Sequence, residues 1–325
     1  MGQFTLFTGT ITGVAGTLIT VLDSILLSVG WTKPAGLIGT NSAAYLSGGA
    51  CPVYLAVNDN SPSSSGKEGL AAGFEAMSGP ATGTLPGVGT NQFPQTGQGS
   101  NTSNPGYFVR KSFTADTTAR TYYAYADAGT LYLFIFSADP GGSTGKYTGF
   151  AFGEFDSFKA GDGYRNLIIG RSAGNSPLVG YESLDVINTT VGGTAYLTSN
   201  GVVQRPYTGV AGSVYVSRMP DMGSVYWPSQ MWLGQGALPY PNPADAKAYL
   251  SAVRLVECNP AGNAYTGVRG TMRGFWACCH PVASFNDGDT FSGTGVLAGR
   301  TFRFVKFSMN GGVYSIETSA TLSDP

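Results

Sequence analysis

The chain has 325 residues, enough for one large or two medium domains, with 42% hydrophobic and only 11% charged residues and a formal net charge of −1. This composition excludes a disordered chain, which has more charge and fewer aromatic residues, and the lack of a basic stripe argues against nucleic acid as a partner. No apolar run reaches the roughly 18 residues that a membrane-spanning helix needs, so no membrane span is predicted. Low charge with 48 glycines favours β-structure with many turns, in an ordinary β-rich domain or in one packed against subunits or glycans.

Residues 1–30 are predicted to form an N-terminal strand and one amphipathic helix. Met1–Ile11 alternates as a strand does, and apolar residues then recur at helical spacing, with Thr17 as the N-cap candidate. Gly30 stands where a C-terminal glycine ends a helix, and Pro34 prevents the helix from restarting. The apolar face is broad and consists of Leu18, Val21, Leu22, Ile25, Leu26 and Val29.

This apolar face has two alternative partners. It docks on the chain's own sheet, as a face of this width usually does, or it packs against copies of itself in an oligomer. Trp31 follows the helix as an aromatic anchor in a turn. For the second alternative, the candidate assembly-interface residues are Leu18, Val21, Leu22, Ile25, Leu26 and Trp31.

Residues 31–325 are predicted to form a β-rich body, either one unit or two lobes. Ala119–Ala126 and Thr130–Ser137 flank a short turn and predict a hairpin whose second strand, apolar on both faces, is central. Lys67–Met77 fits a short helix or a bulged strand. Residues 79–106 are rich in Gly, Pro, Thr and Asn without periodicity, which predicts a long surface loop.

The chain closes on a second predicted hairpin. Arg300–Ser308 alternates as a strand, and Asn310-Gly311-Gly312 supplies the positive φ angles that a tight turn needs before Val313–Thr318. The fold class is therefore mainly β: antiparallel β-sandwich-like units with one N-terminal amphipathic helix and long Gly-rich loops.

Several short patterns suggest chemistry, each with a simpler structural explanation. Gly170–Gly174 matches the G-x-S-x-G nucleophile elbow, but a turn follows where a helix is required, and His280 is the only histidine. Asn286–Asp289 offers oxygen ligands without the further ligands of a calcium loop, so a turn is favoured. No C-x-x-C spacing occurs among the four cysteines, which favours buried free thiols over a metal site. We predict no cofactor, metal or catalytic residue.

Two groups of side chains keep a glycan function open. A carboxylate pair for glycoside hydrolysis could come from Glu154, Asp156, Asp162, Glu182 and Asp185. Aromatic residues that could stack on sugars, although core or interface roles are commoner, are Tyr207, Tyr215, Tyr226, Trp227, Trp232 and Tyr240.

Short segments along the chain resemble a family of tailed-bacteriophage virion structural proteins, often labelled minor tail proteins. They begin with the helix before Gly30-Trp31-Thr32-Lys33-Pro34, and they end with Ile316-Glu317-Thr318-Ser319. Between these lie Gly39–Tyr45, Leu238–Asp245, Tyr249–Leu255, Asp287–Gly293 and Leu297–Arg300. The matching pieces span about residues 13–319 and leave 79–106 and 170–212 uncovered.

The resemblance implies a particle component without known catalysis, on the tail, the baseplate or the head. Its expected partners are other copies of itself and other virion proteins, and its expected location is the virion, assembled in the host bacterial cytoplasm. The alternative is a receptor-binding module that recognises host-surface glycans, and a more distant alternative is a glycan-degrading enzyme.

Overall fold

The computed structural model describes most of the residues of the chain. They are 4–60, 67–82, 86–95, 98, 106–136, 147–170, 201–218, 241, 243–258, 265–278, 280, 284–306 and 313–318.

The described residues form a single α-helix, α1 (Thr17–Leu26), and many short strands. The strands are β1 (Thr5–Ile11), β2 (Ser42–Leu46), β3 (Tyr54–Asn58), β4 (Glu68–Phe74), β5 (Ala76–Gly79), β6 (Val88–Thr90), β7 (Tyr107–Arg110), β8 (Arg120–Ala126), β9 (Thr130–Phe136), β10 (Tyr147–Glu154), β11 (Asp156–Ser157), β12 (Asn166–Ile169), β13 (Gly201–Val203), β14 (Val214–Arg218), β15 (Leu250–Cys258), β16 (Tyr265–Cys278), β17 (Thr290–Ser292), β18 (Thr301–Lys306) and β19 (Val313–Glu317).

The strands belong to three antiparallel sheets. A 13-stranded sheet runs in the order β1-β8-β9-β10-β12-β13-β14-β15-β16-β19-β18-β17, with β11 attached to β16. A four-stranded sheet has the order β2-β3-β4-β7, and β5 pairs with β6. The mainly β, antiparallel fold class predicted from the sequence is confirmed.

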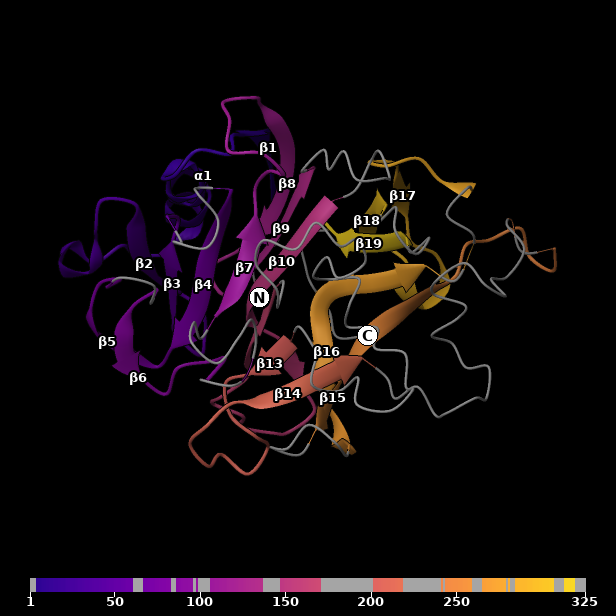
Figure 1. Ribbon diagram of the computed structural model, residues 1–325. Coiled ribbons are helices and arrows are strands. Elements are labelled where there is room, and N and C mark those ends of the chain that lie inside the picture. Colours follow the sequence, from indigo (N-terminus) through magenta and orange to yellow (C-terminus); the bar gives the residue numbers. More distant parts are fainter. Residues whose placement is uncertain are drawn as a thin grey trace.

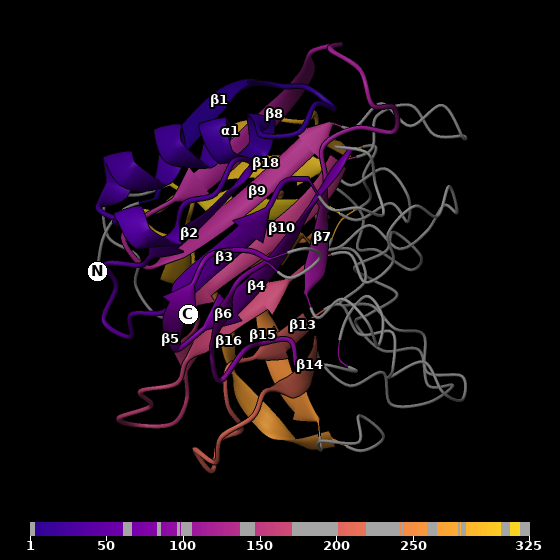
Figure 2. The ribbon, with the colours of Figure 1, turned by 60° about the vertical axis from the view of Figure 1, so that its left-hand side comes forward.

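The sheets pack as three layers around two large apolar cores, and two smaller apolar clusters lie outside them. One core joins the four-stranded sheet and α1 to one face of β8, β9 and β10. The second core joins the opposite face of the same three strands to β14, β15, β16, β18 and β19, because the large sheet folds back on itself. Figure 1 shows β8, β9 and β10 between the other two layers, and Figure 2 shows α1 lying beside β1 and β8.

Strand β9 lies between β8 and β10 in the middle layer and contributes to both cores. Leu131 and Leu133 face the first core, while Tyr132 and Phe134 face the second, and all four are buried. Because each fully buried apolar side chain contributes about 1.5–3 kcal/mol, a strand buried on both faces is a strong organising element. The predicted hairpin of β8 and β9 and its central second strand are confirmed.

The predicted C-terminal hairpin is also confirmed. Strand β18 pairs antiparallel with β19, with Phe304 opposite Ser315 and Lys306 opposite Val313. Strand β17 then adds to the free side of β18, with Phe291 opposite Phe302, and becomes the last strand of the large sheet.

The structure decides one open alternative and corrects one prediction. Of the two alternatives for Lys67–Met77, the strand is the one found, because β4 is buried along its whole length between β3 and β7. Within residues 79–106, Val88–Thr90 forms β6, and the ring of Phe93 is fully buried against Gly73. This segment is therefore partly ordered sheet and core, where a surface loop was predicted.

The N-terminal strand and helix belong to the same body as the rest of the chain. Strand β1 pairs with β8 from Thr5↔Ala126 to Ile11↔Arg120, and α1 packs in the core shared with the four-stranded sheet. Gly30 has φ 91° at the end of the helical segment, as predicted. The two apolar cores correspond to the two-lobe alternative only in part, since β8, β9 and β10 contribute to both.

Candidate functional site

The apolar face of α1 lies inside the chain's own core. The six candidate assembly-interface residues are at most 7% exposed, and they are Leu18, Val21, Leu22, Ile25, Leu26 and Trp31. They contact β-strand residues of the first core. The proposed role of these six side chains in subunit contacts is therefore corrected: they hold the helix to its own sheets, which is the first of the two alternatives.

A buried ion pair fixes the start of the helix. Asp59 accepts a 2.8 Å hydrogen bond from the Leu18 backbone N–H and lies 2.6 Å from the Lys111 Nζ, with both side chains fully buried. Lys111 also donates to the Val14 carbonyl. The predicted N-cap, Thr17, is wrong, because Gly16 occupies that position with φ 87° and the capping carboxylate comes from a distant loop.

The ion pair changes the titration of both groups. Burial raises the pKa of Asp59 to about 6, against the opposing effect of the Lys111 charge. Burial likewise lowers the pKa of Lys111, although the Asp59 carboxylate opposes that shift. The pair is closed to solvent and serves the fold.

Two of the five candidate glycosidase carboxylates meet in one small cavity of about 260 Å³. Glu154 and Asp156 line it together with Asp127, Arg165 and Arg273. Of the other candidates, Asp162 pairs with Arg269 and does not line this cavity, and Glu182 and Asp185 fall outside the described residues.

The carboxylates of this cavity hold the surrounding turns together. Glu154 accepts a 2.8 Å hydrogen bond from the Cys51 backbone N–H. Asp127 accepts from the N–H groups of Gly129 and Thr130 at 2.8 and 2.9 Å, and its other oxygen lies 2.9 Å from Arg273. Burial raises the pKa of Asp127, and Arg273 and these hydrogen bonds oppose the shift. The bonds assign both carboxylates a structural role.

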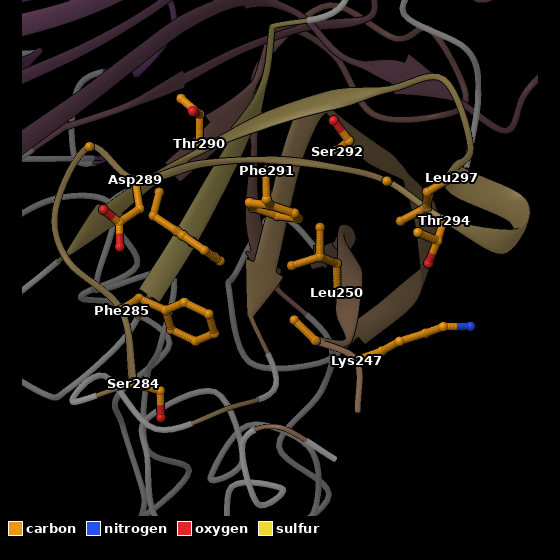
Figure 3. Close-up of a pocket in the computed structure, with 14 residues that line it drawn as sticks. Lys247, Leu250, Ser284, Phe285, Asp289, Thr290, Phe291, Ser292, Thr294 and Leu297 are labelled. Atoms are coloured by element: carbon orange, nitrogen blue, oxygen red, sulfur yellow. The ribbon is translucent and has the colours of Figure 1, made fainter. Parts of the chain in front are cut away.

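A larger groove of about 670 Å³ lies at the β17 edge of the large sheet, where one wall consists of Gly288, Asp289, Thr290, Phe291, Ser292 and Gly293. Figure 3 shows Phe285, Phe291 and Leu250 projecting into the groove from three different segments. Thr290 and Ser292 project from the opposite side of β17, as alternate residues of a strand do.

The floor of the groove is aromatic. Phe291 lies 4.6 Å from Phe304 between ring centroids, and Phe285 lies 4.1 Å from Phe304. Phe285 and Phe304 are buried, whereas Phe291 is half-buried. The rim carries Lys247 and Asp289, and the Asp289 carboxylate accepts a hydrogen bond from the Asn286 backbone N–H. Asn286–Asp289 is thus a turn, as predicted.

A third hollow, of about 290 Å³, lies beside β16. Its rim includes Phe158 and Tyr207, which are 60% and 54% exposed, and its floor includes Glu257 and Arg269. Of the six predicted sugar-stacking aromatics, Tyr207 is the one found exposed in a hollow. Tyr215 is buried in the first core, and the other four lie outside the described residues.

The remaining predicted sites are structural or lie outside the described residues. Ser172, in the G-x-S-x-G match, is outside them. His280 is buried and accepts a 2.7 Å hydrogen bond from the Tyr249 backbone N–H. Cys258 is a buried free thiol and Cys51 a half-buried one. Among the described residues, no group of three or more His, Cys, Asp or Glu side chains is placed to hold a metal ion.

Sequence reasoning missed the groove and the residues Phe158, Glu257 and Arg269. Phe158 carried a weak signal, because it follows the polar pair Asp156-Ser157 at a strand end, next to Lys159. The described residues contain no helix that is long and apolar enough to cross a membrane. Comparison with protein-family models and with curated proteins finds no match to this chain.

Proposed function

We propose that this protein is a structural component of a bacteriophage virion that works through contacts with copies of itself and with other virion proteins. The resemblance described above motivates the proposal. One observation supports it most directly. At the β17 edge of the large sheet, the segment Asp287–Gly293 contains an edge strand and also lines a groove with an aromatic floor.

This end of the molecule has what a subunit contact needs. Strand β17 pairs with β18 on one side only, so its other edge offers unpaired backbone groups among the described residues. The turn Gly295–Leu297 follows β17 and raises Val296 to 96% exposure beside the groove. An edge strand, an apolar tip and a groove with an aromatic floor on one surface form a self-complementary set.

The occupant of the groove is a second copy of the same chain. A two-fold contact places the same patch on both subunits, so Val296 of each copy can enter the groove of the other. The groove volume of about 670 Å³ accommodates a valine and its neighbouring turn residues. In copies of the chain that have no two-fold partner in the particle, the exposed edge of β17 is available to other virion proteins.

The contact is tested with a charge placed on the tip. Sedimentation of the purified chain is expected to show a dimer or larger species that Val296→Asp dissociates, because a buried unpaired carboxylate is costly. Ile38→Asp, at another apolar side chain that is 46% exposed, is the matched control and leaves the assembly intact. A wild-type monomer, or equal effects of both variants, contradicts the two-fold contact.

The virion role has its own test. Mass spectrometry of gradient-purified particles of the encoding phage is expected to detect the chain in a fixed stoichiometry to the other particle proteins. Absence of the chain from purified particles overturns the proposed function, whatever the oligomeric state of the isolated protein.

A further inference from the structure

The hollow beside β16 combines exposed rings with a buried charged floor. Phe158, Tyr207 and Val268 are 60%, 54% and 46% exposed around a space of about 290 Å³. Exposure of two aromatic rings on one small surface is unusual, because aromatic side chains bury large areas in the core whenever the fold allows it. The rings are therefore available to a ligand.

The floor of the hollow is a fixed network of opposite charges. Arg269 lies 2.8 Å from Glu257 and 2.7 Å from Asp162, and all three side chains are at most 4% exposed. Burial raises the pKa of Glu257, whereas hydrogen bonds from Ser157 and Tyr164 and the Arg269 charge outweigh burial and lower the pKa of Asp162. The network thus sets one positive group, Arg269, against two acidic groups, Glu257 and Asp162.

The rim is tied to this floor. The Tyr207 backbone N–H donates to the Glu257 carboxylate at 2.9 Å, and the Lys159 Nζ donates to the Tyr207 carbonyl at 2.5 Å. The backbone N–H of Phe158 donates to the Arg269 carbonyl at 3.0 Å. The backbone of both residues is thus fixed beside the floor before any ligand arrives, which lowers the entropic cost of ordering this rim on binding.

Hydrogen-bonding capacity remains at the floor. Arg269 has five N–H groups, and its bonds to Glu257 and Asp162 use three of them. The Glu257 carboxylate can accept further hydrogen bonds besides those from Arg269 and Tyr207. The hollow therefore has a guanidinium donor and a carboxylate acceptor at its floor and two aromatic rings at its rim. These groups match a ligand that has both hydroxyl groups and apolar C–H faces.

From this arrangement we propose that the hollow binds one uncharged hexopyranose residue of a longer glycan. The C–H face of the sugar stacks on Tyr207 and Phe158, and its hydroxyl groups exchange hydrogen bonds with Glu257 and Arg269. A volume of about 290 Å³ suits a single sugar ring, with the rest of the glycan outside. The charges of Lys159 and Arg269 are offset by Glu257 and the adjoining Asp162, so an anionic sugar is not selected.

Other features distinguish this hollow from the groove at the end of the sheet. In the groove, Phe285 and Phe304 are 6% and 3% exposed and pack mainly on one another, so they present little ring surface to a sugar. The glycan site is therefore separate from the subunit contact and does not depend on the proposed virion role.

The site is tested by binding of neutral polymers. Dextran, mannan and galactan are immobilised, and retention of the purified chain is measured with and without the free monosaccharide as competitor. The wild-type chain is expected to bind at least one polymer, and Tyr207→Ala and Phe158→Ala each to weaken binding about tenfold or more. Both residues are mostly exposed, so the variants are expected to keep the wild-type circular dichroism spectrum.

Tyr249→Ala is the matched control, because Tyr249 is an aromatic residue that is 42% exposed and lies outside the hollow. It leaves binding unchanged. The inference is overturned if none of the three polymers retains the wild-type chain, or if Tyr249→Ala weakens binding as much as Tyr207→Ala does. A variant that loses glycan binding but is still present in purified particles affects only this inference, so the two proposals can fail independently.

Discussion

The two ends of the molecule use apolar surface in opposite ways. At the N-terminal end, α1 buries Leu18, Ile25 and Leu26 completely against its own sheets. At the C-terminal end, the turn after β17 leaves Val296 96% exposed beside a groove with an aromatic floor. The comparison teaches that a strongly amphipathic helix is a poor guide to an interface, because the fold itself provides the surface that covers it.

Buried charge differs between regions in a similar way. The Asp59–Lys111 pair is fully buried under the helix. The Asp162–Arg269–Glu257 network is nearly as buried, but its Glu257 and Arg269 line a hollow with exposed rings. The first arrangement serves folding, and the second leaves polar groups within reach of a ligand.

The largest expected effect comes from breaking the ion pair under the helix. Asp59→Ala is expected to lower the unfolding free energy by about 3–5 kcal/mol, because it leaves the Lys111 ammonium buried without its partner. Urea denaturation measures the change. Lys33→Ala, which removes a pair with the half-exposed Asp23 on the same helix, is the control and costs about 0–1 kcal/mol. Similar losses in the two variants contradict the structural role of the buried pair.

Truncation of the helix face sharpens the comparison between the two ends. Ile25→Ala is expected to lower the unfolding free energy by about 2–5 kcal/mol, because it removes a fully buried side chain from the first core. Sedimentation of the folded variant is expected to match the wild type. A stable variant that has lost its oligomeric state instead identifies the helix as an interface.

The groove is expected to respond less strongly. Phe291→Ala removes a half-buried ring that stacks on Phe302 and Phe304 at centroid distances of 5.1 and 4.6 Å. The loss in unfolding free energy is expected to be about 1–2 kcal/mol, with weaker self-association in sedimentation. If Phe291→Ala lowers the unfolding free energy but leaves self-association unchanged, the groove is not part of the subunit contact.

A further prediction concerns pH. The pKa of Asp59 is raised to about 6 in the fold, against about 4 in an unfolded chain, so the native state keeps this proton to higher pH. The contribution of Asp59 to the unfolding free energy therefore falls as the pH rises from about 4 to about 6. Asp59→Asn has no titrating carboxyl at this position. The unfolding free energy of the variant minus that of the wild type is therefore expected to rise as the pH increases from about 4 to about 6. If the unfolding free energies of the variant and the wild type change in parallel with pH, the raised pKa of Asp59 is contradicted.

The sequence was sufficient for features that depend on local patterns. Alternation and turn residues located the β8–β9 hairpin, and Gly30 marked the end of the helical segment. The apolar face of α1 was also identified, but its partner was not, since periodicity shows which face is buried and not what covers it.

Features that depend on distant contacts escaped prediction. Asp59 stands in a turn of Asn and Asp residues, and nothing local indicates that it caps a helix 41 positions earlier. Glu257 and Arg269 are ordinary charged residues of adjacent strands until Asp162, more than 90 positions away, joins them. The hollow at Phe158 and Tyr207 exists only because these segments meet.

Hydrogen exchange on the free chain and on purified phage particles tests the central claim most directly. The account predicts slower exchange in the particle at Thr290–Ser292 and Gly295–Leu297, which belong to the exposed end of the sheet, and unchanged exchange at Thr17–Leu26, which is buried in both states. Protection of the helix without protection of the β17 end, or absence of the chain from the particle, contradicts it.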